Sequence, residues 1–260
     1  MSIPTLQELL EAGAHFGHHQ SRWNPSMAPY IFGARSRVHI IDLQQTLVGL
    51  EKASAVLREA AAAGKTILFV GTKRQARAIV KQEAERCGMP YVTTRWLGGT
   101  LTNFPTILRS IEKRSSLAEK LSSAGVVRLT KKDQQKMRKE IARLDTVLEG
   151  ILSMRSLPDL IFLVGAHEEK LAVKEARRTG VPVVAVVDTN ADPSEINYVI
   201  PANDDAVRSI ALVVRVMADA VSEGKAQALS ASATAGSSPA PGPESPPVSP
   251  VPAGETSAVL

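Results

Sequence analysis

The chain has 260 residues, 44% of them hydrophobic, which is enough for one sizeable domain or for one domain with an appendage. Its formal net charge of +5 and its pI of about 9.4 favour an anionic partner. The single cysteine, Cys87, excludes an internal disulfide and a cysteine-based zinc finger, and no apolar run approaches the ~20 residues that span a bilayer.

The first predicted element is a short helix over residues 5–13, opened by a capping box and closed by a glycine. Residues 1–14 contain no Lys or Arg, so we expect no signal peptide and a cytoplasmic protein. A histidine-rich loop follows at residues 15–25. After it, the pattern predicts a strand at residues 38–41 and a helix at residues 43–63.

From residue 66 onward, short apolar runs alternate with amphipathic segments. Uninterrupted apolar runs of four or five residues are typical of strands that are covered on both faces. Strands are predicted at 66–70, 91–93, 160–164, 183–187 and 198–200, and helices at 73–87, 168–179 and 204–223. This alternation predicts an α/β fold, a doubly wound parallel sheet with right-handed crossovers and helices on both faces.

Residues 104–155 interrupt the alternation with a long charged segment. Its second half repeats apolar residues at spacings of four and three, which is typical of a heptad seam, and its first half supplies an apolar face opposite. The seam consists of Met137, Ile141, Leu144, Leu148 and Ile151, and the facing residues are Ile107, Ile111, Leu117 and Leu121. The pattern predicts a protruding coiled-coil helical hairpin, with its turn at residues 122–125.

The predicted hairpin carries most of the positive charge. Between residues 105 and 156 there are 12 Lys or Arg and 6 Asp or Glu, a net charge of +6 out of the +7 on residues 1–225. Charge on an exposed helix face is often simple solvation. Here the excess has one sign and recurs on one face, at Lys132, Lys136, Lys139 and Arg143, which favours a stripe that contacts RNA phosphates.

The last 35 residues hold 25 Pro, Ala, Ser or Gly. Such a segment buries too little apolar surface to offset its chain entropy, so we expect residues 226–260 to form a disordered tail. The chain is then divided into an α/β body over residues 1–103 and 156–225, the hairpin insertion over residues 104–155, and this tail.

The sequence lacks the fingerprints of nucleotide-dependent enzymes. Residues 70–75 (VGTKRQ) lead from a strand into a helix but match neither G-x-x-x-x-G-K-[ST] nor G-x-G-x-x-G. A helix start that carries Lys73 and Arg74 is still able to bind a phosphate, and RNA would supply one as well as a nucleotide. No G-x-S-x-G or H-E-x-x-H occurs, and Cys87 fits a packed thiol better than a nucleophile. These observations argue against an enzyme.

One group of residues has the chemistry of a metal site. His18 lies in the histidine-rich loop, and Asp188 and Asp204 follow strands at the edge where α/β sheets collect ligands. One interpretation is a structural zinc or magnesium ion held by these three residues. The alternative is a hydrogen-bonding histidine beside helix-capping aspartates. In either case we expect no cofactor to be required.

Seven sequence blocks share the order and spacing of one known family. They are residues 12–18 (AGAHFGH), 22–25 (RWNP), 30–35 (YIFGAR), 67–73 (ILFVGTK), 95–103 (RWLGGTLTN), 187–190 (VDTN) with 192–193 (DP), and 200–205 (IPANDD). Over residues 1–225 the chain resembles the bacterial-type second protein of the small ribosomal subunit. The resemblance implies a flavodoxin-like α/β/α body with a protruding coiled-coil hairpin.

The resemblance also implies a structural role in the small subunit of a bacterial ribosome. There the chain would bind ribosomal RNA between head and body, beside neighbouring ribosomal proteins, and would help to dock the large mRNA-binding ribosomal protein. The residues expected to contact RNA are Arg22, Trp23, Arg35, Arg37, Lys73, Arg74, Arg95, Arg109, Lys113, Arg114, Lys131, Lys132, Lys136, Lys139 and Arg143. Trp23 either stacks on a base or packs in the core, and the sequence leaves that choice open.

Two rival functions come from other classes. A nucleotide- or metal-dependent α/β enzyme would bind a nucleotide in the absence of RNA. A coiled-coil scaffold without RNA would bind its partners regardless of salt and of charge reversal on the hairpin.

Overall fold

The computed structural model describes residues 3–122 and 130–235, and its centre is a sheet of five parallel strands. The strands are β4 (Ile67–Val70), β5 (Tyr91–Val92), β6 (Leu160–Val164), β7 (Val183–Val187) and β8 (Tyr198–Pro201). They lie in the spatial order β5-β4-β6-β7-β8. Numbered along the chain, this is the order 2-1-3-4-5 of flavodoxin-like sheets. The prediction of an α/β fold with a parallel sheet is confirmed.

Helices cover both faces of this sheet. Because successive side chains of a strand point to opposite faces, Leu160, Phe162 and Val164 of β6 enter one core and Ile161 and Leu163 enter another. The first core packs under α2 (Leu43–Ala62), α3 (Arg77–Cys87) and α7 (Val207–Ala235), with α1 (Leu6–Glu11) at its rim. The second packs under α6 (Lys170–Thr179) and the base of the hairpin.

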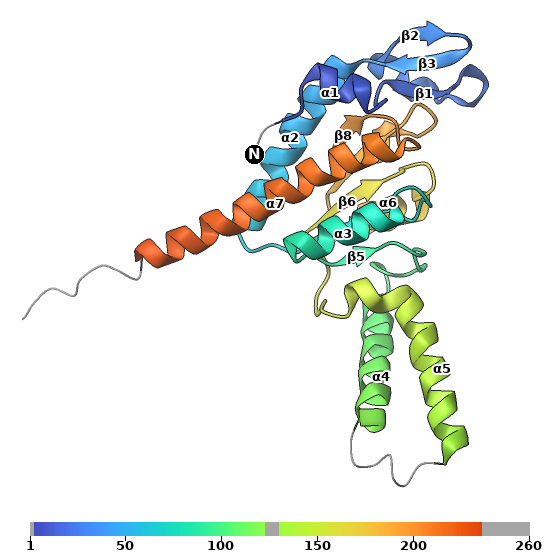
Figure 1. The fold of residues 1–260 in the computed structure, drawn as a ribbon, viewed down its shortest axis with the longest axis vertical. Coiled ribbons are helices and arrows are strands. Elements are labelled where there is room, and N and C mark those ends of the chain that lie inside the picture. Colours follow the sequence, from blue (N-terminus) through green and yellow to red (C-terminus); the bar gives the residue numbers. More distant parts are fainter. Residues whose placement is uncertain (1–2, 123–129, 236–260) are drawn as a thin grey trace, which may run out of the picture.

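A second, antiparallel sheet of three strands lies beside the carboxyl ends of the central strands (Figure 1). It consists of β1 (Phe16–His19), β2 (Ile31–Arg35) and β3 (Val38–Ile41), with the short 3-10 helices η1 (Gln20–Arg22) and η2 (Pro25–Tyr30) between β1 and β2. Only β3 was predicted. The loop predicted over residues 15–25 contains β1, whose pairing to β3 changes register between Phe16 and His19, so the sequence shows no regular alternation there.

Two helices differ most from their predicted bounds. α3 begins at Arg77 instead of residue 73, because the preceding residues form a tighter turn in which Ala76 N donates to Lys73 O at 2.9 Å. α7 continues to Ala235, so residues 226–235 are helical where a disordered tail was expected. Alanine, the strongest helix former, recurs in this stretch, and no proline intervenes. The remainder of the predicted tail, residues 236–260, lies outside the described residues.

The hairpin consists of α4 (Phe104–Ser122) and α5 (Lys131–Leu148) and projects from the body (Figure 1). At its base, α5 leads into η4 (Glu149–Ile151). There a Cβ on Gly150 would lie 2.1 Å from Tyr91 O, so this contact with β5 requires glycine. Leu144 and Leu148 of the predicted seam are buried at the base.

Toward the tip of the hairpin, an open depression of about 390 Å³ lies between the two helices, with Leu121 and Ile141 among its lining residues. A helical hairpin is thus present, and its coiled-coil character remains a prediction. The predicted turn begins at the last residue of α4, and residues 123–125 lie outside the described residues.

Candidate nucleic-acid interface

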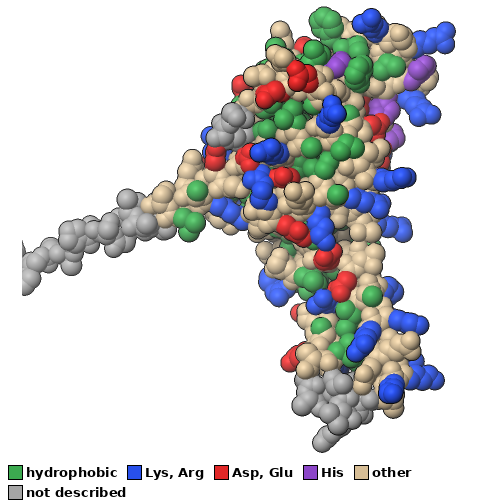
Figure 2. Space-filling model, viewed as in Figure 1, with side chains coloured by type: hydrophobic (Ala, Val, Ile, Leu, Met, Phe, Trp, Pro, Cys, Tyr) green, Lys and Arg blue, Asp and Glu red, His purple; other side chains and the backbone are tan. Residues whose placement is uncertain are grey.

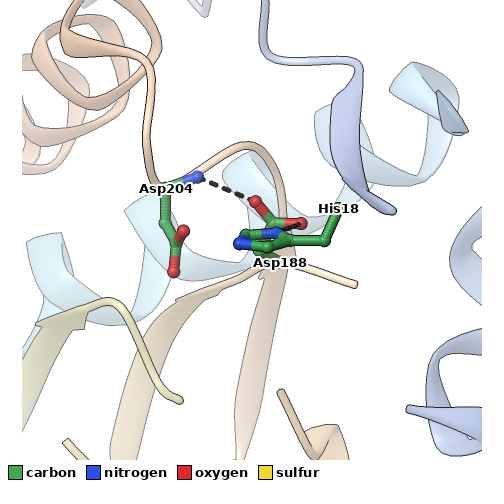
Figure 3. Close-up of side chains that lie close together, drawn as sticks. All are labelled: His18, Asp188 and Asp204. Atoms are coloured by element: carbon green, nitrogen blue, oxygen red, sulfur yellow. Dashed lines mark hydrogen bonds and ion pairs between the residues drawn. The ribbon is translucent and has the colours of Figure 1, made fainter. Parts of the chain in front are cut away.

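His18 joins the three-stranded sheet to the carboxyl ends of the central strands. It lies on β1, whereas Asp188 and Asp204 follow β7 and β8, and the three side chains meet in one cluster (Figure 3). His18 Nδ1 lies 3.1 Å from Asp188 Oδ1, and His18 Nε2 lies 3.2 Å from Asp205 Oδ2. The hydrogen bond to Asp188 raises the pKa of His18, although burial opposes this shift. The structure therefore brings together the residues proposed as metal ligands.

The backbone beside His18 is fixed to the same edge of the sheet. His18 N donates to Thr189 Oγ1 at 2.8 Å, and Asn24 N donates to Thr189 O at 2.7 Å. A Cβ on Gly17 would lie 2.6 Å from Thr189 Cγ2, so only glycine allows this approach. These contacts give the histidine-rich segment a structural role that does not depend on a metal.

Lys73 also belongs to this cluster, although the sequence assigned it to the RNA surface. Its Nζ donates to Asp204 and Asp205 and lies 3.4 Å from Glu168 Oε1, and only 8% of its side chain is exposed. Burial lowers the pKa of the Lys73 ammonium, but the three carboxylates outweigh it and raise this pKa above its usual value. The charge of Lys73 is therefore used inside the protein, and we leave Lys73 out of the proposed RNA contacts.

The nitrogen and oxygen atoms of this cluster are of the types that bind metal ions. One imidazole nitrogen and two carboxylate oxygens, from His18, Asp188 and Asp204, lie within 4.8 Å of one another. Asp204 Oδ2 is buried without a hydrogen-bond partner among the described residues. Zinc accepts such nitrogen and oxygen ligands. However, the Lys73 ammonium already neutralises Asp204, so a metal ion would have to compete with it.

Glu175 on α6 organises the RWLGGTLTN segment, and the sequence reasoning missed it. Its buried carboxylate accepts hydrogen bonds from Trp96 Nε1 at 3.2 Å and from the backbone N–H groups of Gly99 at 2.7 Å and Leu101 at 3.0 Å. Burial raises the pKa of Glu175, but these backbone donors outweigh it and lower the pKa. The feature of the sequence that could have indicated this role is a glutamate on the apolar face of a helix. Because Trp96 is held inward, Arg95 remains at the surface.

Five arginines of the body are exposed near the carboxyl ends of the strands and form no ion pair with any described residue. They are Arg22, Arg35, Arg37, Arg74 and Arg95. Ser36 (φ 52°) and Arg37 (φ 66°) both take left-handed backbone conformations, which is typical of the tight turn that joins β2 to β3. Beside them, Trp23 is 37% exposed and Phe32 is 80% exposed. Trp23 is therefore not a core residue, and its ring contacts that of His39 in a tilted arrangement, with the ring centres 5.0 Å apart.

Three of the predicted RNA contacts on the hairpin are engaged in ion pairs within it. Lys113 Nζ lies 2.8 Å from Glu140 Oε1, and Arg143 binds the same carboxylate. Arg114 Nε donates to Asp145 Oδ1 at 2.6 Å, and its Nη2 donates to Asp145 Oδ2 at 3.2 Å. Hydrogen bonds from Arg143 and then Lys113 lower the pKa of Glu140 to about 2. All three cations are partly neutralised, and Lys113 and Arg114 also join α4 to α5, whereas the pair of Arg143 with Glu140 lies within α5.

The other cations of the hairpin have no such partner among the described residues. Those predicted to contact RNA are Arg109, Lys131, Lys132, Lys136 and Lys139, and all five are exposed. Figure 2 shows Lys and Arg side chains along one edge of the molecule, from the three-stranded sheet down to α5. We use the name basic edge for the exposed cations that were predicted to contact RNA and form no ion pair with any described residue, namely Arg22, Arg35, Arg37, Arg74, Arg95, Arg109, Lys131, Lys132, Lys136 and Lys139. None of the described helices is long and apolar enough to cross a membrane.

Comparisons with known proteins identify the family that this chain matches. Residues 9–224 match the family described as ribosomal protein S2. The chain is 50% identical to small ribosomal subunit protein uS2 of Petrotoga mobilis, over 86% of this chain and 78% of that protein. It is 51% identical to the protein of the same name from a Nitratiruptor species, over 85% and 83% of the two chains. For the protein of that name from Endomicrobium trichonymphae the identity is 52%, over 86% and 92%.

The match covers most of the chain, including the body, the described hairpin helices and most of α7. Ribosomal protein S2 is a structural and non-enzymatic protein of the small subunit, so the prediction that this chain is not an enzyme is confirmed. By the extent of the family match and by the identity to all three relatives, the chain belongs to the ribosomal protein S2 family.

Proposed function

We propose that this chain binds ribosomal RNA of the small subunit through its basic edge. The observation that carries the proposal is the contrast in pairing on the hairpin, where three cations bind carboxylates and five others lack any described partner. Unpaired, exposed cations of one sign attract phosphates and release counterions when they bind. Lys132, Lys136 and Lys139 lie four and three residues apart, so they share one side of α5.

The body end of the basic edge has aromatic residues as well as cations. Trp23 and Phe32 are exposed beside Arg22, Arg35 and Arg37. Single-stranded RNA is commonly bound by stacking its bases on such rings while cations contact the phosphates. We therefore propose that α5 contacts phosphates and that the three-stranded sheet contacts phosphates together with an unpaired base.

A salt series tests this proposal. The full chain is titrated with small-subunit RNA fragments, and the logarithm of the affinity is plotted against the logarithm of the salt concentration. Changing Lys132, Lys136 and Lys139 to Glu should lower the steepness of this plot by about 2 to 3 units, because each lost phosphate contact removes about 0.7 to 0.9. The matched control reverses Lys52, Lys174 and Arg178, three exposed cations outside the basic edge. An equal loss in both variants would contradict the proposal.

The finer placement in the ribosome follows from the family resemblance. We propose that the chain lies at the junction of head and body, in the cytoplasm of a bacterium, and helps to dock the large mRNA-binding ribosomal protein. Small subunits assembled without this chain should then lose that protein and regain it when the chain is added. Retention of the large protein in subunits that lack this chain would refute its role in docking.

A second proposal concerns the His18, Asp188 and Asp204 cluster. The buried Asp204 Oδ2 without a partner favours binding of one zinc ion, which would be structural. Zinc titration followed by calorimetry should show one site in the wild type and none in Asp188→Asn. If the wild type binds no zinc, Lys73 is the only cation that this cluster needs.

A further inference from the structure

A cavity of about 600 Å³ lies at the amino ends of the central strands, on the side opposite the three-stranded sheet. It is enclosed by the ends of α2 and α3, by residues 153–156 ahead of β6, and by α7. Figure 1 shows α7 continuing past the body on this side, away from β1, β2 and β3. Neither the basic edge nor the His18 cluster contributes a residue to this cavity.

Three cations line the cavity, and no carboxylate of the described residues does. They are Lys65, Arg155 and Lys225. Lys225 Nζ donates to Cys87 O at 2.7 Å and to Gly88 O at 3.0 Å, and Arg155 Nη1 donates to Leu152 O at 3.0 Å. These carbonyls fix the two cations in place, but they carry no full charge and leave both cations uncompensated.

Lys65 has no described partner and is exposed. The carboxylate of Asp159 accepts a hydrogen bond from Thr66 N at 2.9 Å, and Asp159 does not line the cavity. The cavity is therefore a concave surface with a local excess of positive charge, and an anionic occupant would be favoured there.

The walls between these cations include apolar side chains as well as polar ones. Met89 and Met154 are 8% and 5% exposed, and Leu229 of α7 is 71% exposed. Methionine side chains adapt to the shape of an apolar partner. Among the residues that the structure describes, no aromatic side chain lines the cavity, so these residues offer an RNA base no ring on which to stack. Cations around methionine and leucine fit a peptide that carries both acidic and aliphatic side chains.

We propose that this cavity is a docking site for an acidic peptide segment of a neighbouring protein. The segment places an aliphatic side chain between Met89, Met154 and Leu229, and its carboxylates bind Lys65, Arg155 and Lys225. This interaction goes beyond the proposed RNA binding, because it uses the opposite end of the sheet and leaves the basic edge free. It would also give the end of α7 a surface to pack against.

The test uses the full chain and a fluorescein-labelled peptide EELEEL, with fluorescence anisotropy as the readout. Two control peptides separate the components of the site, because EEGEEG lacks the aliphatic side chains and KKLKKL reverses the charge. We expect EELEEL to bind with a dissociation constant of about 10 to 100 µM and at least about tenfold more tightly than either control. Absence of saturable EELEEL binding, or equal binding of EEGEEG, would overturn the proposal.

Variants locate the binding within the molecule. Lys65→Glu with Arg155→Glu should weaken EELEEL binding by at least about tenfold, and Leu229→Ser should weaken it by about threefold. The matched control is Lys174→Glu with Arg178→Glu, which changes the net charge equally outside the cavity and outside the basic edge and should leave binding unchanged. An equal loss in both double variants would show general charge attraction and overturn the docking site.

Discussion

Lys73 on the body and Lys136 on the hairpin carry the same charge in opposite environments. Lys73 is nearly buried among Asp204, Asp205 and Glu168, whereas Lys136 is exposed and has no described partner. The sequence suggested phosphate binding for both residues. Lys73 lies at a predicted helix start, and Lys136 belongs to a stripe of cations on one helix face. The comparison shows that a cation is available to RNA only when the fold brings no carboxylate close enough to pair with it.

The strongest way to test this contrast is to remove the buried charge. Lys73→Met leaves the neighbouring carboxylates of Asp204 and Asp205 without their cation, so the free energy of unfolding should fall by about 3 to 5 kcal/mol. Urea unfolding followed by circular dichroism at neutral pH measures this change. Arg74→Met, one residue along and exposed, should change it by no more than about 0.5 kcal/mol.

A double variant separates the charge from the packing of the side chain. Adding Asp204→Asn to Lys73→Met removes one of the two clustered carboxylates and should restore part of the lost stability. If Lys73→Met is as mild as Arg74→Met, the ammonium of Lys73 is solvated and available to RNA after all.

The next largest effect is expected at Glu175, which supports the segment that carries Arg95. Glu175→Ala leaves the N–H groups of Trp96, Gly99 and Leu101 without their acceptor, which should cost about 2 to 3 kcal/mol. Urea unfolding measures the cost, and the fluorescence of Trp96 in a Trp23→Phe background reports on the segment itself. Glu59→Ala, at an exposed glutamate, is the control, and an equal loss there would contradict the role of Glu175.

The central sheet could be predicted because its signal is local. Runs such as Ile67–Val70 are apolar throughout, and a strand with helices on both faces needs that composition and little else. β1 could not be predicted from its own residues. Its position depends on the close contact of Gly17 with Thr189, which lies far away in the sequence. The extension of α7 was not predicted, because the alanine-rich end of this helix was grouped with the proline-rich residues that follow it.

The candidate site was predictable in residue type but not in pairing. The sequence placed His18, Asp188 and Asp204 together because strand ends meet at one edge of a sheet. It could not show that Lys73 reaches the same cluster, or that Arg114 binds Asp145 across the hairpin. Both depend on which carboxylate the fold brings within reach, and residues far apart in sequence decide that.

The stability of the protein at low pH should show whether Glu175 is charged in the folded state. Its pKa is lowered in the folded protein, so its stabilising effect is fully present above the unfolded pKa, near 4.5, and is lost as the pH falls through the folded value. The difference in unfolding free energy between wild type and Glu175→Gln should therefore shrink as the pH is lowered below about 4.5. A difference that is constant between neutral and acidic pH would show that Glu175 stays uncharged.

The smallest effects should distinguish paired from unpaired cations on the hairpin itself. Arg114→Ala breaks the contact with Asp145 that joins α4 to α5, so it should lower the unfolding free energy by at most about 1 kcal/mol. It should leave the salt dependence of RNA binding nearly unchanged. Lys136→Ala should do the reverse, with a stability change below about 0.5 kcal/mol and a salt plot less steep by about 0.7 to 0.9. If both variants flatten the plot equally, pairing within the hairpin does not decide which cations contact RNA.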